Sequence, residues 1–278
     1  MPELPEVETV RRGLEEHVAG CRVLDLAIIG PRTVRRHDPN LIKLEVVGKK
    51  ITGCSRYGKY LILGLDDNLC MVIHLRMTGR LQLITDVPDL HDRHMHAYFT
   101  LDNDTSLVFF DPRTFGEIFL SKLMTANNLP EEISSLGPDP IVSDSWKDYL
   151  SKTIPTKSIP LKTLLLDQRI ISGIGNIYSD EICHDAGIIP IKRSNTLSKS
   201  EIKLLSKSIT TILTKAINNK GSTLGDKKYL DITGGEGSYQ NHHKVYKRAG
   251  QACYRCKSTI VKVKVSGRSS HYCPNCQF

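Results

Sequence analysis

The positions of apolar residues divide the chain into a β-rich half and a helical half. Near the N-terminus, Pro5 can begin a helix, and apolar residues recur after it at helical spacing: Val7, Val10, Leu14 and Val18. From about residue 23 to 120, short β-prone runs are separated by Gly, Asp and Asn; the clearest are 60–65, 71–75, 96–101 and 106–110. This second pattern predicts an antiparallel sandwich or barrel.

The helical half follows a segment with no sustained period. Residues 129–141 are rich in Pro, Ser, Gly and acidic residues, which is typical of a linker. Beyond it, periodic apolar faces predict helices over 149–153, 161–167, 177–186 and 199–218. A Gly-rich stretch, 221–238, then leads into a small β unit. We therefore expect an α+β protein with domains over 1–132 and 151–240, a linker over 133–150 and a terminal unit over 241–278.

The charge of the chain changes the picture because it is concentrated at one end. The formal net charge is +8 and the pI is near 9.0, values that also fit many enzymes with solvated lysines. From Gly237 to Phe278, however, there is no Asp or Glu, and the basic residues are Lys244, Lys247, Arg248, Arg255, Lys257, Lys262, Lys264 and Arg268. Such a run indicates a polyanionic partner, since basic side chains that neutralise phosphates release condensed counterions.

The apolar pattern argues against a membrane protein. No apolar stretch approaches the length that spans a bilayer, and the chain starts with acidic residues rather than a basic segment and an apolar run. We expect a soluble protein that acts inside the cell, in the cytoplasm.

Four of the eight cysteines have the spacing of metal ligands. Cys253 and Cys256 are followed, after sixteen residues, by Cys273 and Cys276. This arrangement predicts one tetrahedral zinc site, structural because four thiolates leave no open position. Residues 259–266 alternate apolar and basic side chains before Gly267, which predicts a hairpin between the two zinc-binding turns. The site could serve stability alone, but its basic residues favour a hairpin that faces a polyanion.

The remaining cysteines lie in apolar surroundings: Cys21, Cys54, Cys70 and Cys183. In a secreted chain they could form disulfides, but we interpret them as reduced, small core residues.

The start of the chain offers a candidate covalent catalyst. If the initiator Met1 is removed, Pro2 becomes a free secondary amine, which can attack an electrophilic sugar carbon, displace a base and form an iminium ion. Glu3 and Glu6 are near enough in sequence to manage the protons. On chemistry alone a structural role is the commoner one, because proline often precedes an acidic first turn of a helix.

A family resemblance reverses that balance. The string PELPEVETVRRGL (2–14) resembles the signature of formamidopyrimidine-DNA glycosylases, enzymes that remove oxidised purines from DNA. Further matching motifs follow in the family's order: RYGKY (56–60), HLRMTG (74–79), RHMH (93–96), DPRTFG (111–116), GIGNIY (173–178) and the terminal cysteines. The resemblance covers essentially the whole chain. It implies an N-terminal β-sandwich with a long first helix, and a C-terminal helix-two-turn-helix domain with a hairpin zinc finger.

The resemblance also implies roles for the matching residues. Pro2 forms a Schiff base with the sugar C1′, Glu3 transfers a proton during ring opening, and Glu6 supports the helix start and the pocket. Lys59 contacts the lesion and its phosphate and assists β-elimination, while Arg268 lies near the phosphate for δ-elimination. Without its motif, Lys59 would be interpreted as a solvated surface lysine.

The expected partner is double-stranded DNA that contains oxidised purines or abasic sites, bound by a monomer. An enzyme that acts on a base in duplex DNA must extrude the nucleotide and fill the space it leaves. Met77, Arg113 and Phe115 match the family's void-filling residues, although Met77 or Phe115 alone would more often be a core residue. Candidate phosphate contacts are His74, His94, Lys157, Lys162, Asn176, Tyr246 and Arg248. The loop 221–239 can cover the extruded base in the family, and its glycines favour mobility.

Some positions depart from the family pattern. Tyr57 stands where Arg is common, Thr114 replaces a basic residue, and HHKVYK (242–247) lacks the usual final glycine, so the backbone path at Lys247 stays open.

Three alternatives remain. The sister glycosylase for oxidised pyrimidines is disfavoured by Leu4, Arg113 and Phe115. A catalytically silent DNA-binding relative would need none of Pro2, Glu3 and Lys59. A zinc-dependent hydrolase is disfavoured by the four-cysteine site.

Overall fold

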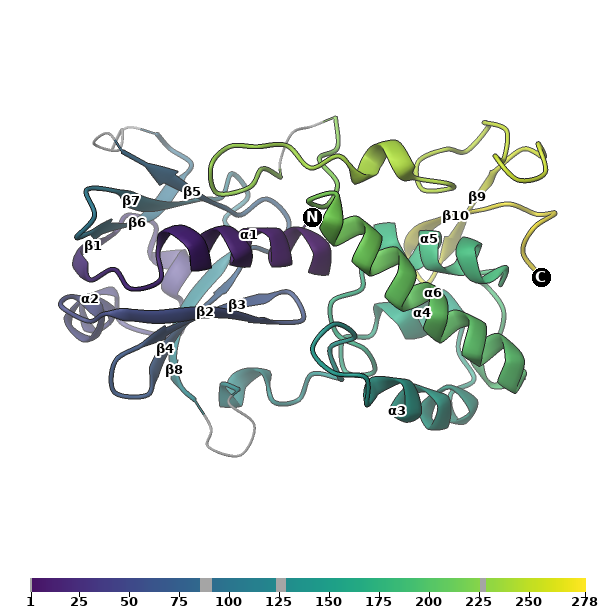
Figure 1. Cartoon of the computed structure of the whole chain (residues 1–278), viewed down its shortest axis with the longest axis horizontal. Coiled ribbons are helices and arrows are strands. Elements are labelled where there is room, and N and C mark those ends of the chain that lie inside the picture. Colours follow the sequence, from purple (N-terminus) through teal and green to yellow (C-terminus); the bar gives the residue numbers. More distant parts are fainter. Residues whose placement is uncertain (1, 86–91, 124–128, 226–228) are drawn as a thin grey trace. The chain divides into compact units, whose positions relative to one another are not determined.

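The computed structural model describes residues 2–85, 92–123, 129–225 and 229–278 (Figure 1). The chain forms two compact units, one of Met1–Ser135 with Lys220–Ser238 and one of Leu136–Asn219 with Tyr239–Phe278. This division differs from the predicted ranges at two places. The boundary falls at 135/136, so most of the expected linker belongs to the second unit, and the Gly-rich segment returns to the first unit. The segment returns because Tyr229 and Ile232 pack into the core of the first unit.

The first unit contains two four-stranded antiparallel sheets. One has the order β1 (Val23–Ile28), β6 (Met95–Leu101), β7 (Ser106–Phe110), β5 (Arg80–Ile84); the other has the order β2 (Ile51–Tyr57), β3 (Tyr60–Leu65), β4 (Leu69–His74), β8 (Glu117–Lys122). The predicted antiparallel sandwich is confirmed. Helices η1 (Pro31–Val34) and α2 (Pro39–Val46) connect β1 to β2, and η2 (Glu131–Ile133) follows β8.

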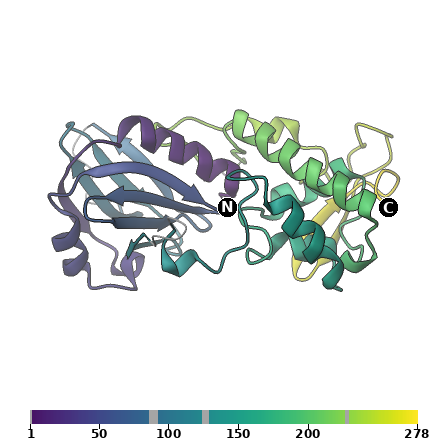
Figure 2. The same ribbon diagram turned by 60° about the horizontal axis from the view of Figure 1, so that its bottom comes forward.

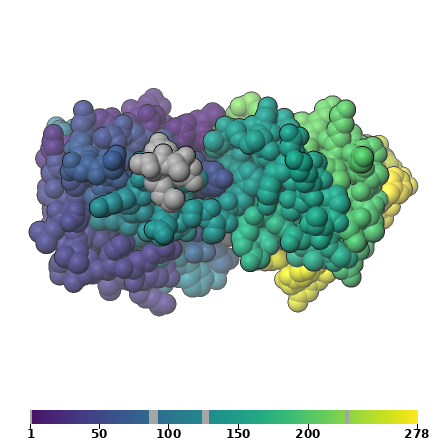
Figure 3. Space-filling model, turned by 90° about the horizontal axis from the view of Figure 1, so that it is seen from below, coloured from purple at the N-terminus to yellow at the C-terminus, as the bar shows by residue number. Residues whose placement is uncertain are grey.

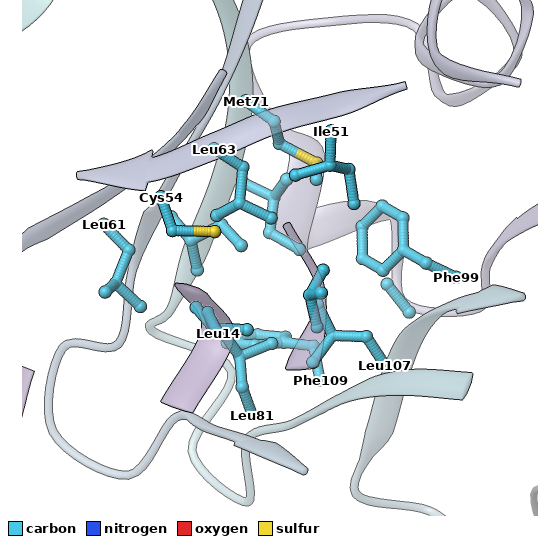
Figure 4. Packing of buried hydrophobic residues seen from close by; sticks show 14 of the residues in the cluster. Leu14, Ile51, Cys54, Leu61, Leu63, Met71, Leu81, Phe99, Leu107 and Phe109 are labelled. Atoms are coloured by element: carbon cyan, nitrogen blue, oxygen red, sulfur yellow. The ribbon is translucent and has the colours of Figure 1, made fainter. Parts of the chain in front are cut away.

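The first helix, α1 (Leu4–His17), lies along the sheets (Figure 2). Its start is a capping box, in which Glu3 and Glu6 each accept a hydrogen bond from the other's backbone amide. The apolar face predicted from the sequence is fully buried. Leu14 points into a core that also contains Leu61 from β3 and Phe109 from β7 (Figure 4). Burial of this face, and not helix propensity, is what stabilises the helix.

The Gly-rich segment is part of the same core. The side chains of Tyr229 and Ile232 are buried among the residues of the two sheets, and the Leu83 amide of β5 donates to the Ile232 carbonyl over 2.8 Å. Ile232 lies so close to α1 that a Cβ added at Gly13 would be 2.7 Å from its Cγ1. The segment therefore needs a glycine on the facing helix, and its described part is anchored to the first unit.

The second unit is helical, with a terminal hairpin. Its elements are α3 (Trp146–Thr153), η3 (Ile154–Thr156), α4 (Leu161–Leu166), α5 (Asn176–Ala186), η4 (Ser194–Thr196), α6 (Lys199–Asn218), η5 (Tyr239–His242), β9 (Val261–Val265) and β10 (Arg268–Tyr272). The predicted helices are present, and α3 begins three residues early. The hairpin turn is confirmed, since Ser266 and Gly267 have φ values of 44° and 82°, the two-residue form that suits paired strands.

A groove of about 550 Å³ lies between α3 and α6 in this unit, on the face where teal meets green in Figure 3. Its lining includes Ile202 and Ser206 but none of the predicted site residues. Among the described helices, none is long and apolar enough to cross a membrane.

Candidate active site

The predicted catalytic residues at the N-terminus are buried at the start of α1. Pro2 is buried, and Glu3 and Glu6 are each 1% exposed. Glu6 accepts from the Glu3 amide over 2.8 Å and from the Ser222 amide over 2.7 Å, one bond to each carboxylate oxygen. Both amides therefore fix the orientation of this carboxylate. Gly221, with φ +73°, approaches so closely that a Cβ there would be 2.6 Å from Oε1 of Glu6.

Lys59 is the second residue of a tight turn that is tied to α1. Gly58 has φ +58°, and Arg56 donates to the Gly58 carbonyl over 2.9 Å and to Glu8 of α1 over 3.0 Å. Burial alone would raise the pKa of Glu8, but hydrogen bonds and charge from Arg11 and Arg56 lower it below the ordinary value. The Arg56–Glu8 pair thus holds the β2–β3 turn against the first turns of α1, and Lys59 is 8% exposed there.

His74 is a neutral group at the end of β4. Burial, with the positive charges of Arg76 and Lys59 nearby, lowers its pKa well below the ordinary value. Its Nδ1 accepts the Arg76 amide over 2.9 Å, so the proton is on Nε2, and Tyr60 packs edge-on at 4.3 Å between ring centroids. A phosphate contact from His74 would therefore be a hydrogen bond from a neutral ring and not an ion pair.

The three predicted void-filling residues lie on two loops that Asp111 joins. Its carboxylate accepts a hydrogen bond from the Thr78 hydroxyl on the β4–β5 loop. It accepts another, 2.6 Å long, from the Gly116 amide on the β7–β8 loop. The first loop carries Met77 and the second carries Arg113 and Phe115. Met77 and Phe115 are 38% and 42% exposed, and the Arg113 guanidinium lies 4.9 Å from the Phe115 ring centroid. Two exposed apolar side chains beside an arginine suit insertion into a base stack. His94, half-buried, adjoins this cluster, because its carbonyl accepts the Asp111 amide.

Both loops contain a residue in the left-handed region that favours glycine. Thr114 has φ +55° and Arg76 has φ +51°. For a β-branched residue this conformation is strained. Lys247 in the second unit has φ +57°, so the chain keeps a glycine-like conformation at the position where the family's glycine is replaced.

The other predicted DNA contacts lie in the second unit. Lys157 and Arg268 are exposed, while Asn176, at the start of α5, and Tyr246 are half-buried. Arg248 is engaged locally: it donates to the carbonyls of Lys244 and Ala252 and stacks on Tyr254, with 3.6 Å between Cζ and the ring centroid.

The buried position of Lys162 contradicts the prediction that this side chain contacts a phosphate. The side chain is fully buried, and its Nζ lies 2.6 Å from Asp180 Oδ1 and 2.7 Å from the Ser269 carbonyl. A buried ammonium needs a charged partner, and Asp180 is that partner. Asp180 also accepts from the His271 amide over 2.9 Å. The pair therefore joins α4 and α5 to β10, the strand that Arg268 begins.

The four predicted zinc ligands come together. All four sulfur atoms lie within 4.8 Å of one another, with 3.3 Å between Cys256 and Cys273 and 4.0 Å between Cys253 and Cys276. Tetrahedral zinc with Zn–S bonds of about 2.3 Å would separate its ligands by about 3.8 Å, so the cluster fits the ion. The other cysteines are reduced; burial raises the pKa of Cys54 and of Cys70 to about 12.

The sequence reasoning overlooked the residues that position the site. Asp111 and Gly116 lie within the motif DPRTFG (111–116), whereas Ser222 lies in a segment whose packing no sequence pattern predicted. Glu181 directly follows Asp180 in a helix otherwise rich in buried residues, and it accepts amides 244, 245 and 246 over 2.8–3.0 Å. Burial raises the pKa of Glu181 in spite of these amides. Two adjacent acids among the apolar residues Ile177, Tyr178 and Ile182 could have indicated such partners, because buried carboxylates require them.

A sandwich that holds a carboxylate cluster beside an N-terminal proline, and a helical unit with a basic zinc hairpin, define a nucleic-acid-processing enzyme. Sequence models of three domains match the chain: Formamidopyrimidine-DNA glycosylase N-terminal domain (1–118), Formamidopyrimidine-DNA glycosylase H2TH domain (136–228) and Zinc finger found in FPG and IleRS (250–277). The chain belongs to the formamidopyrimidine-DNA glycosylase family.

Individual relatives agree over the full length. The formamidopyrimidine-DNA glycosylase of Desulforamulus reducens is 40% identical over 278 residues, 100% of this chain and 99% of the relative. Among solved structures, Lactococcus lactis Fpg in complex with DNA containing an abasic site superposes with a TM-score of 0.88 at 36% identity, covering 99% of each chain. The complex of Lactococcus lactis FPG with DNA containing FAPY-dG superposes with a TM-score of 0.86 at 36% identity, and also covers 99% of each chain.

Proposed function

We propose that this chain excises oxidised purines from duplex DNA and then cleaves the strand at the abasic site, with Pro2 as the nucleophile. The observation that carries the proposal is the buried start of α1, where a proline that can become a free secondary amine adjoins Glu3 and the doubly hydrogen-bonded Glu6. The relatives named as formamidopyrimidine-DNA glycosylases, and the similar structure bound to FAPY-dG DNA, support this substrate class.

The chemistry begins with attack of the Pro2 nitrogen on C1′ of the damaged nucleotide. The glycosidic bond breaks and the base leaves with its bonding electrons, and it takes up the proton that the attacking amine gives up. Glu3 donates a proton to O4′ as the C1′–O4′ bond opens, and the amine loses its own proton, which leaves an iminium ion between Pro2 and C1′. Glu6 does not move protons in this scheme. It fixes the helix start and, through Ser222, the segment that follows it.

Strand cleavage follows from the iminium ion. Loss of a proton from C2′ expels the 3′ phosphate, and a second elimination expels the 5′ phosphate. Lys59, held on its turn by Arg56, lies in the same unit as Pro2 and assists the first elimination. Arg268, at the exposed start of β10, assists the second. His74 binds a phosphate oxygen as a neutral donor.

DNA binding uses exposed and half-buried residues of both units. Met77, Arg113 and Phe115 fill the space left by the extruded nucleotide, and His94, Lys157, Asn176, Tyr246 and Arg248 bind backbone or sugar. One zinc ion, held by the four cysteines, supplies rigidity to the hairpin when bound. We infer that the protein acts as a monomer and, in the cell, on chromosomal DNA in the cytoplasm.

Trapping with borohydride tests the proposal directly. Protein with a free Pro2 is incubated with an 8-oxoguanine duplex in the presence of borohydride, which reduces the iminium ion to a stable protein–DNA adduct. Peptide mapping is expected to place the adduct on residue 2. Protein that retains Met1 or carries an acetylated Pro2 is the matched control, and it should bind DNA yet form no adduct. An adduct on Lys59, or normal cleavage by blocked protein, would overturn the role of Pro2.

The same assay separates the alternatives. Duplexes that carry a single oxidised pyrimidine should be cleaved more slowly than those that carry 8-oxoguanine or a formamidopyrimidine. A preference for the pyrimidine would favour the sister glycosylase, and binding without cleavage of any lesion would favour a silent relative.

A further inference from the structure

His184, near the end of α5, makes a contact that the four-cysteine template does not require. Its side chain is 1% exposed, and Nε2 lies 3.7 Å from Sγ of Cys253. An imidazole N–H and a zinc-bound thiolate are a donor and an acceptor, so this distance, within the range of hydrogen bonds to sulfur, gives the ring a defined tautomer.

Two other cysteines of the cluster, Cys256 and Cys273, have donors from their own turns. Cys256 receives hydrogen bonds from the side chain and backbone of Ser258, and Cys273 receives them from the backbone amides of Asn275 and Cys276. Cys253 is fully buried, so solvent does not supply a donor to it. Four thiolates carry more negative charge than one zinc ion neutralises, and hydrogen-bond donors offset that excess.

A second contact holds the same turn against α5. Arg255, between the first two zinc ligands, donates from Nη1 to the His184 carbonyl over 2.9 Å, and its Nη2 lies 3.5 Å from Asp185 Oδ1. His184 is therefore linked to the first zinc-binding turn through both its side chain and its backbone. The two links leave the imidazole little freedom to turn away from Cys253.

We propose that His184 is a positioning residue of the zinc site, which donates its Nε2 proton to the Cys253 thiolate and so slows loss of the metal. The donor comes from α5, outside the two zinc-binding turns, so the metal affinity of the site depends on the helical part of the unit. The proposal does not rest on the repair activity.

Zinc release provides the first test. Zinc-loaded full-length protein is mixed with a chromogenic chelator, and the rate of metal transfer is recorded. His184→Phe and His184→Met fill the space without a donor, and each is expected to weaken zinc binding about 10–100-fold. His184→Gln keeps an N–H donor and should restore most of the affinity. His243→Phe is the matched control, since this buried ring packs edge-on against Tyr239 and Tyr246; it should release zinc at the parent rate.

Cobalt substitution supplies a readout that packing alone does not move. Removal of an N–H donor raises the energy of the sulfur lone pairs, so the sulfur-to-cobalt charge-transfer bands of His184→Phe and His184→Met should shift to longer wavelength, while those of His184→Gln and His243→Phe should not. Fluorescence of Trp146, buried in the same unit, checks that each variant is folded. Parent-like zinc release and bands in the two variants that lack the donor would overturn the proposal, and so would equal loss of zinc in all three His184 variants.

Discussion

The two units both bury carboxylates beside a helix, yet they use them differently. In the first unit, Glu6 accepts two backbone amides at the start of α1, next to Glu3 and a potential amine nucleophile. In the second, Glu181 accepts three backbone amides and fixes the segment at 244–246. Burial and satisfied hydrogen bonds therefore do not identify a catalytic acid. The presence of a reactive partner distinguishes the two sites.

The lysines repeat the contrast. Lys59 lies in a turn that Arg56 braces, whereas Lys162 is enclosed with Asp180 and a carbonyl. The first unit also leaves Met77 and Phe115 exposed and holds Thr114 at positive φ. The loops that we assign to DNA binding thus contain destabilising features, whereas the polar contacts of Lys162 and Glu181 stabilise the second unit.

The sharpest way to break this comparison is to remove one charge from each carboxylate cluster. Glu3→Gln should slow base excision by about 10²–10⁴-fold, because a general acid is lost, with little change in stability. Glu181→Gln is the matched counterpart, and it places a side-chain amide where three backbone amides donate hydrogen bonds. It should lower the free energy of unfolding by about 1–3 kcal/mol, while the protein that remains folded should excise the base at the parent rate. Single-turnover cleavage gels and chemical denaturation measure the two effects.

Equal loss of rate in both variants would remove the distinction between the clusters. A Glu3→Gln protein with normal excision would assign the proton transfer to another group.

The buried lysine supplies the next largest effect. Lys162→Met leaves the Asp180 charge buried without its partner and should cost about 3–5 kcal/mol of unfolding free energy. The double variant Lys162→Met, Asp180→Asn should recover part of that loss. Trp146, the single tryptophan of the chain, is buried in the second unit, so its fluorescence during denaturation reports on that unit. Lys157→Met, at an exposed lysine, is the control and should change stability little; a similar small change in Lys162→Met would contradict the assignment.

A smaller effect is expected at Phe115, an exposed residue of the predicted void-filling set. Phe115→Ala should slow excision of 8-oxoguanine from duplex DNA by about tenfold, equivalent to about 1.4 kcal/mol, because the vacated base position is filled less well. Cleavage at a preformed abasic site should change less, since base removal is bypassed. Tyr149→Ala, at a tyrosine of similar exposure in the second unit, controls for loss of a surface aromatic. Equal losses on both DNA substrates would remove the wedge role.

The smallest effect concerns strain in the same loop. Thr114→Asn should raise the free energy of unfolding by about 1 kcal/mol, because asparagine tolerates positive φ better than a β-branched residue. The hydrogen bond from the backbone amide of residue 114 to the Asp111 carbonyl is retained. Thermal denaturation of the two proteins measures the gain. Unchanged or lower stability would mean that the loop relaxes its threonine by other means.

The sequence predicted the elements whose signals are local. The α1 face from Val7 to Leu14, the strand pattern and the cysteine spacing each contain enough information within a short window. The misses depend on contacts between distant segments. Lys162 looks like a surface lysine until Asp180, eighteen residues away, is placed beside it, and residues 220–238 look like a free loop until Ile232 meets Gly13. Residue roles came from the family resemblance and stay predictions.

The return of residues 220–238 to the first unit has a consequence for any attempt to divide the protein. The polypeptide passes between the units at three places, 135/136, 219/220 and 238/239, so no single cut yields two complete pieces. A fragment that ends at residue 135 would lack Tyr229 and Ile232 from its core and the Ser222 donor to Glu6. The first unit is thus formed by two separate stretches of sequence, and the second stretch follows the long helices of the other unit.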